Sequence, residues 1–322
     1  MRRYLFLATE DGLLTLQGEK ERWQAFARGL EGHKITTVAA RDGVVLAGSP
    51  SGLYRSDDLG KTWQGEKEGL TIPHFRCLVY FGGGSVLAGT EPAGIFVSHN
   101  NGRSWRECPE VARLRDKHGW CLPYSPNAGC VRDFACLGAR VYAAVEQGGV
   151  LRSEDGGETW NLVEGSTGNP TQKPPEAYVH PDVHLLLGHP SAPHLVYAAT
   201  GDGLYRSDDG GKTWLRKYES YCRAVWSDPK DFDHVVLGPA DTVESNGRIE
   251  ESFDGGLSWK PASAGLETPW QNYMVERFFN MEEQLLALLS SGHIIATPWS
   301  KYSWHYILRQ MPAVKALAWM KR

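Results

Sequence analysis

Short apolar runs of about five residues recur along the chain, rich in valine, leucine and tyrosine. Glycine, aspartate or proline bounds each run. Representative runs are Val44–Gly48, Val86–Thr90, Val141–Val145 and Val196–Thr200. Runs of this length and composition between turn-forming residues are typical of β-strands. The pattern therefore predicts a chain built mainly of short strands.

An eight-residue motif shows that these strands belong to a repeat. Its five copies are Ser56–Trp63, Ser98–Trp105, Ser153–Trp160, Ser207–Trp214 and Ser252–Trp259. Trp23 and Trp304 stand where two further copies would end, although the residues before them have diverged. Each unit contains four predicted strands, and radial repetition of four-stranded units predicts a β-propeller.

The motif resembles the Asp-box, or BNR, repeat of sialidase-like propellers, and the resemblance covers nearly the whole chain. It implies a tight turn between the third and fourth strands of each blade. The motif aspartates Asp58, Asp155, Asp209 and Asp254 would then accept backbone N–H groups, and the motif tryptophan would pack between neighbouring blades. Asn100 replaces the aspartate in the second copy and can form the same type of turn.

The innermost strand of each unit allows the blades to be counted. Seven are expected, at Lys34–Ala40, His74–Tyr80, Cys130–Cys136, Asp182–Gly188, Tyr221–Ser227, Tyr273–Phe279 and Ala313–Trp319. No further strand follows the last of them, whereas the three N-terminal strands have no inner strand before them. Joining the two ends predicts an all-β, seven-bladed propeller, one domain over residues 1–322. Its last blade would combine one C-terminal and three N-terminal strands, which leaves no open edge in the ring.

Composition excludes several classes of function. The 322 residues carry a formal net charge of −4 and contain no basic run, so attraction to a nucleic-acid backbone is not expected. No apolar segment approaches the length of a membrane span, and the apolar run near Met1 is too short for a signal peptide. We therefore expect a cytoplasmic, monomeric protein with no nucleic-acid partner, no membrane partner and no cofactor.

Six cysteines suit a reducing compartment as free thiols. Three fall in inner strands and are expected in the core: Cys77, Cys136 and Cys222. The others accompany a histidine in the spacing C-x9-H-x2-C-x8-C: Cys108, His118, Cys121 and Cys130. Zinc sites use these residue types, but the spacing matches no common pattern. Ordinary cysteines are therefore expected, with a metal site or a disulfide as the alternative.

Two insertions interrupt the repeat, at residues 107–129 and 162–181. Both join an outer strand to the next inner strand, and such connections emerge on one face of a propeller. We therefore expect both insertions above one mouth of the central channel. The first contains Pro109–His118, which is expected to form a helical turn or two. The motif turns would lie on the opposite face and are expected to be structural.

One position of the inner strands concentrates charged residues. Aligning the seven strands on their apolar residues places seven side chains at equivalent positions, named here the ring residues: Thr36, Arg76, Arg132, His184, Arg223, Glu276 and Lys315. Alternation along a strand turns all of them to one side. If that side is the channel, converging arginines suit a carboxylate, a phosphate or a sugar acid. The alternative is that the cations pair with acids in the strand connections: Glu10, Glu91, Glu146, Asp202 and Asp241.

Further residues are expected around the same mouth: His74, His180, Asp182, Tyr124, Trp120 and Tyr178. Histidines and paired carboxylates can exchange protons near neutral pH. The candidate catalytic residues are therefore Glu146, Glu91 and His184. The candidate ligand-binding residues are Arg76, Arg132, Arg223, Lys315, His74, Glu276, Asp202, His180, Tyr178 and Tyr124.

Two classes of function remain open. One is binding of a small anionic molecule at the channel mouth, with hydrolysis or elimination as the reaction if the site is catalytic. The other is a non-catalytic scaffold for a protein partner, since the chain also resembles the photosystem II stability/assembly factor group. Sialidase or other glycoside hydrolase activity is less favoured. Sialidases have six blades and an early Arg-Ile-Pro motif, which this chain lacks, and Tyr273 and Glu276 are expected to face opposite sides of a strand.

Overall fold

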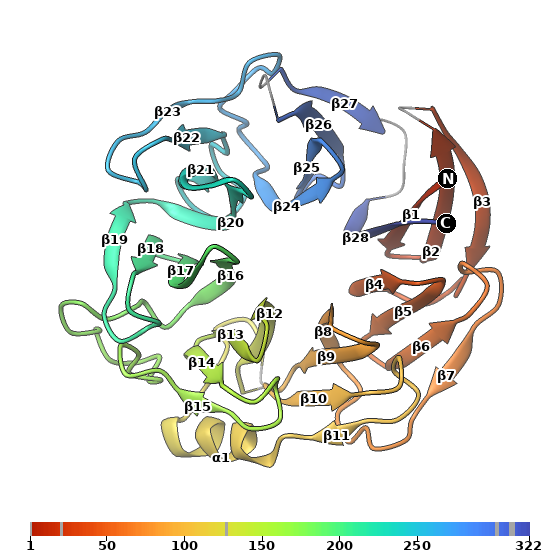
Figure 1. Cartoon of the computed structure of the whole chain (residues 1–322), viewed down its shortest axis with the longest axis horizontal. Helices are drawn as coiled ribbons and strands as arrows, with labels where there is room; N and C mark the ends of the chain where they lie inside the picture. Colours follow the sequence, from red (N-terminus) through yellow and green to blue (C-terminus); the bar gives the residue numbers. More distant parts are fainter. Residues whose placement is uncertain (1, 20–21, 126–127, 300–302, 309–312) are drawn as a thin grey trace.

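The structure, a computed structural model, describes residues 2–19, 22–125, 128–299, 303–308 and 313–322. These residues form seven four-stranded antiparallel sheets that radiate from a central channel (Figure 1). The all-β, seven-bladed propeller predicted from the repeat is therefore confirmed. Each blade has an inner, a second, a third and an outer strand, counted from the channel.

The inner strands are β28 (Val314–Lys321), β4 (Thr37–Arg41), β8 (Phe75–Phe81), β12 (Cys130–Leu137), β16 (Val183–His189), β20 (Tyr221–Asp228) and β24 (Val275–Met281). The second strands are β1 (Arg3–Thr9), β5 (Val44–Ser49), β9 (Ser85–Thr90), β13 (Arg140–Glu146), β17 (Ala192–Thr200), β21 (Asp231–Ala240) and β25 (Gln284–Leu289). The third strands are β2 (Gly12–Glu19), β6 (Gly52–Ser56), β10 (Ile95–Ser98), β14 (Gly149–Ser153), β18 (Gly203–Ser207), β22 (Glu250–Ser252) and β26 (Ile294–Pro298). The outer strands are β3 (Arg22–Gly29), β7 (Gln64–Glu66), β11 (Arg106–Glu107), β15 (Asn161–Leu162), β19 (Leu215–Tyr218), β23 (Lys260–Pro261) and β27 (His305–Leu308).

The two ends of the chain close the ring as predicted. One sheet has the order β28-β1-β2-β3. In it Arg3 lies opposite Lys321 and Leu7 opposite Leu317, and the labelled N- and C-termini lie close together in Figure 1. The ladder hydrogen bonds of this sheet therefore join the first residues of the propeller to the last.

Apolar side chains between the blades form the core. The described residues make seven buried clusters, and each cluster is shared by two neighbouring blades. Every cluster includes or contacts one tryptophan of the repeat: Trp23, Trp63, Trp105, Trp160, Trp214, Trp259 and Trp304. Aromatic side chains of this size bury more apolar surface than any other type, so the regular spacing of tryptophan reflects the regular spacing of the interfaces.

The motif turns have the expected structural role. In the turn after β18, Asp209 Oδ1 accepts the N–H groups of Lys212 and Thr213 at 3.0 and 2.9 Å, and Oδ2 accepts the Thr213 hydroxyl at 2.7 Å. Gly211 has a φ of +92°, a conformation that favours glycine. Asn100 accepts two backbone N–H groups at 3.1 and 3.0 Å in the equivalent turn. These residues therefore serve the fold.

The first insertion begins with the helix α1 (Pro109–His118), which lies on the outer edge of the ring beside β15 (Figure 1). It ends at Gly119, whose φ of 65° lets the chain turn back. Trp120 then donates from Nε1 to the carbonyl of Gly168 at 2.7 Å, which ties the first insertion to the second. Among the described residues, no helix combines the length and apolar character needed to cross a bilayer.

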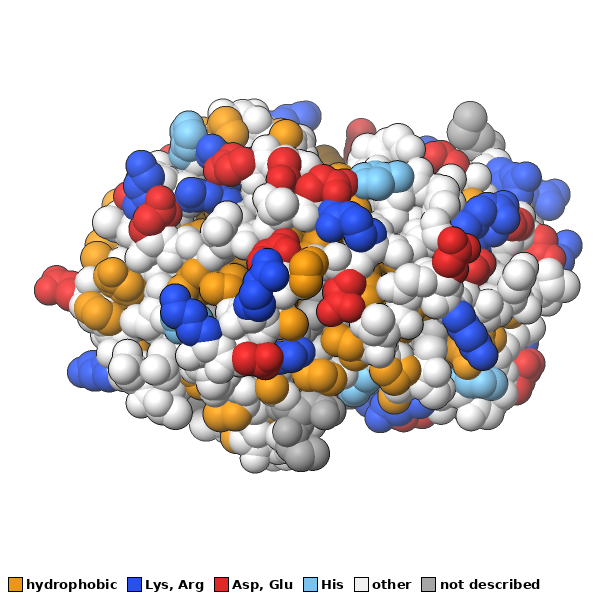
Figure 2. Space-filling view, turned by 90° about the horizontal axis from the view of Figure 1, so that it is seen from below, with side chains coloured by type: hydrophobic (Ala, Val, Ile, Leu, Met, Phe, Trp, Pro, Cys, Tyr) orange, Lys and Arg blue, Asp and Glu red, His pale blue; other side chains and the backbone are white. Residues whose placement is uncertain are grey.

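Charge is dispersed over the side of the molecule seen in Figure 2. Lysine and arginine side chains alternate there with aspartate and glutamate, and neither sign occupies a broad area. This distribution agrees with the small net charge of the chain.

Candidate binding site at the channel mouth

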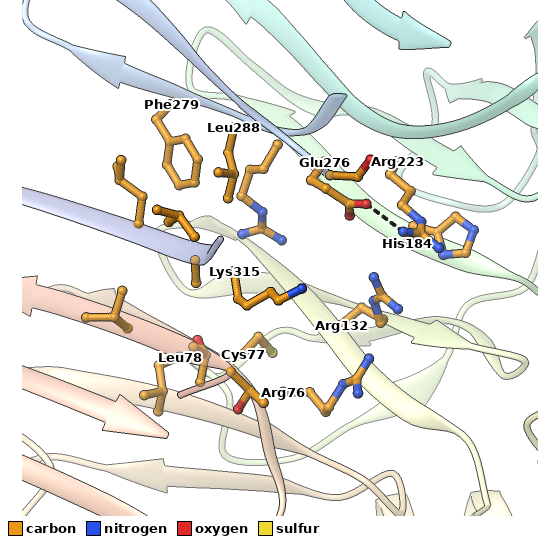
Figure 3. A pocket seen from close by; sticks show the side chains of 18 of the residues that line it. Arg76, Cys77, Leu78, Arg132, His184, Arg223, Glu276, Phe279, Leu288 and Lys315 are labelled. Atoms are coloured by element: carbon orange, nitrogen blue, oxygen red, sulfur yellow. Dashed lines mark hydrogen bonds and ion pairs between the residues drawn. The ribbon is translucent and has the colours of Figure 1, made fainter. Parts of the chain in front are cut away.

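All seven ring residues line one cavity of about 520 Å³ in the central channel. Figure 3 shows Arg76, Arg132, Arg223 and Lys315 facing this cavity from different strands. The sequence alignment of the inner strands therefore identified the side of each strand that faces the channel.

Backbone irregularities explain why these side chains converge. Six of the seven ring residues are the extra residue of a β-bulge, Thr36 being the exception. In β8, for example, Phe75 pairs with Thr90 and Cys77 pairs with Gly89, so that Arg76 has no residue opposite it. A bulge interrupts the ladder and redirects the side chain of the extra residue. The channel lining thus depends on a repeated bulge near the start of the inner strands.

Glu146 is the most highly coordinated acid of the mouth. Its Oε2 lies 2.8 Å from Nη1 of Arg132 and 3.2 Å from Sγ of Cys130, and its Oε1 accepts the hydroxyl of Tyr124 at 2.6 Å. Burial raises the pKa of Glu146, but the charge of Arg132 and the donated hydrogen bonds outweigh it and lower the pKa to about 2. Glu146 therefore stays ionised at neutral pH, which suits it to holding Arg132 rather than to donating a proton.

Glu91 holds the neighbouring ring residue Arg76 in the same way. Its Oε2 lies 3.2 Å from Nη1 of Arg76 and 3.9 Å from Nδ1 of His74, and its Oε1 accepts the hydroxyl of Ser125 at 2.8 Å. Burial lowers the pKa of His74, and the charge of Glu91 opposes that shift. Tyr124 and Ser125 both belong to the end of the first insertion, so this stretch reaches the acids of two blades.

Arg223 is paired with another ring residue. Its Nη1 lies 2.6 Å from Oε1 of Glu276, and its Nε donates to the hydroxyl of Tyr221 at 2.7 Å. Glu276 is one of the predicted ligand-binding residues, and in the structure it pairs with a cation from the adjacent blade.

The last cation of the ring is also paired. Nζ of Lys315 lies 3.3 Å from Oε1 of Glu10, and Nζ of Lys34 lies 3.2 Å from the other oxygen. Each ring arginine and the ring lysine therefore has a carboxylate oxygen within 3.3 Å. The mouth presents ion pairs rather than free cations, which is the alternative that the sequence left open.

Three of the predicted mouth residues line a different cavity. Tyr178, His180 and Asp202 lie in a hollow of about 800 Å³ formed with the second insertion. Asp202 pairs there with Arg216 at 2.9 Å and accepts the hydroxyl of Tyr205 at 2.9 Å. The expectation that these three residues share the cavity of the ring residues is therefore corrected. Asp241, another acid expected to face the ring cations, pairs with Arg248 at 3.0 Å.

Three charged residues among the described cavity-lining residues were not predicted from the sequence: Lys34, Glu244 and Arg277. Arg277 follows Glu276, and strict alternation would turn it away from the channel. Because of the bulge between Val275 and Arg277, both charged side chains line the cavity. Nη2 of Arg277 lies 2.9 Å from Oδ1 of the buried Asp133. Asp133 directly follows Arg132 in the sequence, but strict alternation along the strand assigned only Arg132 to the channel.

His184 is a buried ring residue whose side chain makes no hydrogen bond to the described residues. It is 4% exposed, and both of its ring nitrogens lack a hydrogen-bond partner among the described residues. Its Nε2 lies 3.4 Å from Oδ2 of Asp182, whose Oδ1 also lacks a partner. Each buried polar group without a partner costs about 1–3 kcal/mol. Burial lowers the pKa of His184 well below its usual value and raises that of Asp182 to about 6.

The cysteines are all free thiols, so the disulfide alternative is wrong. Cys121 is exposed, whereas Cys108 and Cys130 are buried. Sγ of Cys108 points to the carbonyl of Gly157 at 3.5 Å, and Sγ of Cys130 points to Glu146. Burial raises the pKa of both thiols to about 12, which keeps them protonated.

The comparisons with known proteins identify the fold. No family model matches the chain, and no curated protein matches it in sequence. Among solved structures, an ancestral GH74 enzyme aligns with a TM-score of 0.62 and 16% identity over 85% of this chain, which spans 38% of that enzyme. YCF48 bound to a D1 peptide aligns with a TM-score of 0.60 and 15% identity, covering 89% of this chain and 85% of the other. YCF48 from Cyanidioschyzon merolae aligns with a TM-score of 0.57 and 13% identity, covering 89% and 92%. This chain is thus a seven-bladed β-propeller whose fold is similar to those of YCF48 and of part of the GH74 enzyme.

Proposed function

We propose that this chain is a non-catalytic scaffold that binds a peptide segment of a protein partner at the channel mouth. The observation that carries the proposal is the position of Tyr124. It is 59% exposed and lines the channel cavity, while its hydroxyl is held 2.6 Å from Oε1 of Glu146. A rigid, exposed tyrosine loses little conformational freedom on binding, and tyrosine is enriched at the centre of protein interfaces.

The ion pairs of the mouth favour a peptide over a simple anion. A free anion would have to compete with a carboxylate that already lies 2.6–3.3 Å from each ring cation. A peptide carries N–H donors, carbonyl acceptors and side chains of both signs, so it can contact the pairs without separating them. Complementarity of both signs contributes specificity even where each contact adds little affinity.

The comparison with YCF48 supports this proposal. A YCF48 structure contains a D1 peptide, and the aligned region covers most of both chains. At 15% identity the likeness concerns the fold, so it indicates that a propeller of this shape can accommodate a peptide.

The test uses a phage-displayed library of random dodecapeptides selected on the full chain. Affinities of synthetic hits are then measured by fluorescence polarisation. Tyr124→Ala should weaken binding by at least about tenfold, because an interface tyrosine often contributes more than 1 kcal/mol. Phe253→Ala is the matched control, since Phe253 is 55% exposed and stacks on His234 rather than on the mouth. Selection of no peptide, or equal loss in both variants, would refute the proposal.

Binding of a small anion is the second candidate, and the cavity lining favours it. Among the described residues, the cavity is lined by six cations, Lys34, Arg76, Arg132, Arg223, Arg277 and Lys315, and by three glutamates, Glu146, Glu244 and Glu276. Citrate, phosphate and glucuronate are suitable probes in a thermal-shift assay, because a ligand of the folded state raises the melting temperature. A shift that is lost in Arg132→Ala and kept in Arg103→Ala, a surface control, would favour this candidate. No shift with any of the probes would exclude it.

A further inference from the structure

Three side chains at the edge of the channel cavity bring metal-ligating atoms together. One ligand atom each from Glu146, Asp182 and His184 lies within 4.8 Å of the others. Nε2 of His184 and Oδ2 of Asp182 are 3.4 Å apart. Ligands about 2.1 Å from a tetrahedral zinc ion are themselves about 3.4 Å apart. The spacing of this pair therefore already matches that of two ligands of one ion.

The second observation is that several buried polar atoms of this cluster have no hydrogen-bond partner among the described residues. His184 is 4% exposed, and neither of its ring nitrogens has a hydrogen-bond partner among the described residues; the same holds for Oδ1 of Asp182. These atoms lie in the cluster itself, because the His184 ring faces Asp182 and packs against Tyr221 at a ring-centroid distance of 5.2 Å. Native proteins seldom leave such groups unsatisfied, which points to a missing ligand.

We propose that Glu146, Asp182 and His184 bind one divalent transition-metal ion, of the zinc type, beside the channel cavity. One imidazole nitrogen with two carboxylate oxygens suits Zn²⁺ better than Mg²⁺ or Ca²⁺, which prefer oxygen ligands alone. Three protein ligands leave a fourth coordination position, as in sites where zinc also binds a small molecule. Glu146 and His184 both line the cavity, so that position would open into it.

The surroundings of Glu146 are compatible with this role. A carboxylate offers about four lone-pair positions. Three are used by Tyr124, Arg132 and Cys130, which leaves one for an ion. Hydrogen bonds from neighbouring residues commonly orient a carboxylate that binds a metal ion. The charges of Glu146, Asp182 and Arg132 together are −1 when both acids are ionised, so one cation can be accommodated.

The probe is Zn²⁺, titrated by calorimetry into the metal-stripped full chain, with Mg²⁺ titrated in parallel. We expect one equivalent of Zn²⁺ to bind and Mg²⁺ not to bind. His184→Gln and Asp182→Asn should each weaken Zn²⁺ binding by at least about 100-fold. Tyr124→Phe removes the hydrogen bond to Glu146 and should weaken Zn²⁺ binding by about tenfold. The matched controls His99→Gln and Asp208→Asn alter exposed side chains elsewhere and should bind as the wild type does.

The location of the ion provides a test that needs no variant. Crystals of the wild-type chain soaked in Zn²⁺ should give an anomalous-scattering peak within coordination distance of all three side chains. No stoichiometric Zn²⁺ binding, equal binding of Mg²⁺, or unchanged binding in both ligand variants would overturn the proposal. If circular dichroism shows that a ligand variant does not fold, the anomalous peak of the wild-type crystal alone tests the site. A peak at another place, or none, refutes the site.

Discussion

Arg277 and Asp133 form an ion pair across the central channel, with Nη2 and Oδ1 2.9 Å apart. Arg277 lies on β24 and Asp133 on β12, and these inner strands belong to blades three positions apart in the ring of seven. Oδ2 of Asp133 also accepts the N–H of Leu186 from the next blade at 3.2 Å. One buried carboxylate therefore connects three blades.

Removing this carboxylate should destabilise the propeller. Asp133→Ala leaves the Arg277 guanidinium and the Leu186 N–H without their acceptor, and we expect the free energy of unfolding to fall by about 3 kcal/mol. Urea denaturation followed by tryptophan fluorescence measures the change. Asp133→Ala combined with Arg277→Met should recover part of the loss, because no unpaired charge remains. A loss below about 1 kcal/mol in the single variant would mean that the pair adds little to stability.

The tryptophans between the blades should differ in their contribution to stability. Trp160 is 1% exposed, whereas Trp259 is partly exposed in the equivalent position of another motif copy. Trp160→Ala opens a cavity in the interface and should cost about 3–5 kcal/mol. Trp259→Ala should cost clearly less. Parallel urea denaturation of the two variants checks the order, and equal losses would contradict it.

The motif turns should make stability depend on pH in the acid range. Burial raises the pKa of Asp58 and of Asp155, but the hydrogen bonds donated within each turn outweigh burial and lower the pKa of each to about 2. A carboxyl whose pKa is lower in the folded state stabilises that state above its unfolded pKa. The contribution is lost as the pH falls from about 4 toward 2.

Replacing both aspartates by asparagine tests this dependence. Asn100 already forms the same turn without titrating, so Asp58→Asn with Asp155→Asn should still fold. We expect its melting temperature to fall less between pH 4.5 and pH 2.5 than that of the wild type. Thermal denaturation of both proteins across that pH range measures the two changes. An identical fall in both proteins would assign the acid sensitivity to other groups.

Neutralising an acid of the mouth should create an anion site. Glu91→Gln keeps an acceptor for Ser125 but removes the charge that holds Arg76 at 3.2 Å. We expect citrate to bind this variant at least about tenfold more tightly than the wild type, a gain of about 1.4 kcal/mol. Calorimetry at low ionic strength gives both affinities. Glu158→Gln, at the exposed pair with Arg106, is the control and should leave citrate affinity unchanged.

Local patterns in the sequence were sufficient to predict the architecture. The spacing of the motif and of its tryptophans predicted seven blades, and the unmatched strands at both ends predicted the pairing of β1 with β28. The alignment of the inner strands also identified all seven ring residues as channel-lining. These features could be predicted because a strand pattern and a turn each depend on residues that are close together in the chain.

The chemistry of the mouth depends on residues that are far apart in the chain. Arg223 meets Glu276, Arg277 meets Asp133, and neither distance follows from strand alternation once a bulge has shifted the register. His184, whose sequence pattern is the same as that of the paired ring residues, has no hydrogen-bond partner among the described residues. These two pairs join separate blades, and distances of a few ångströms between separate blades exist only after the ring has closed.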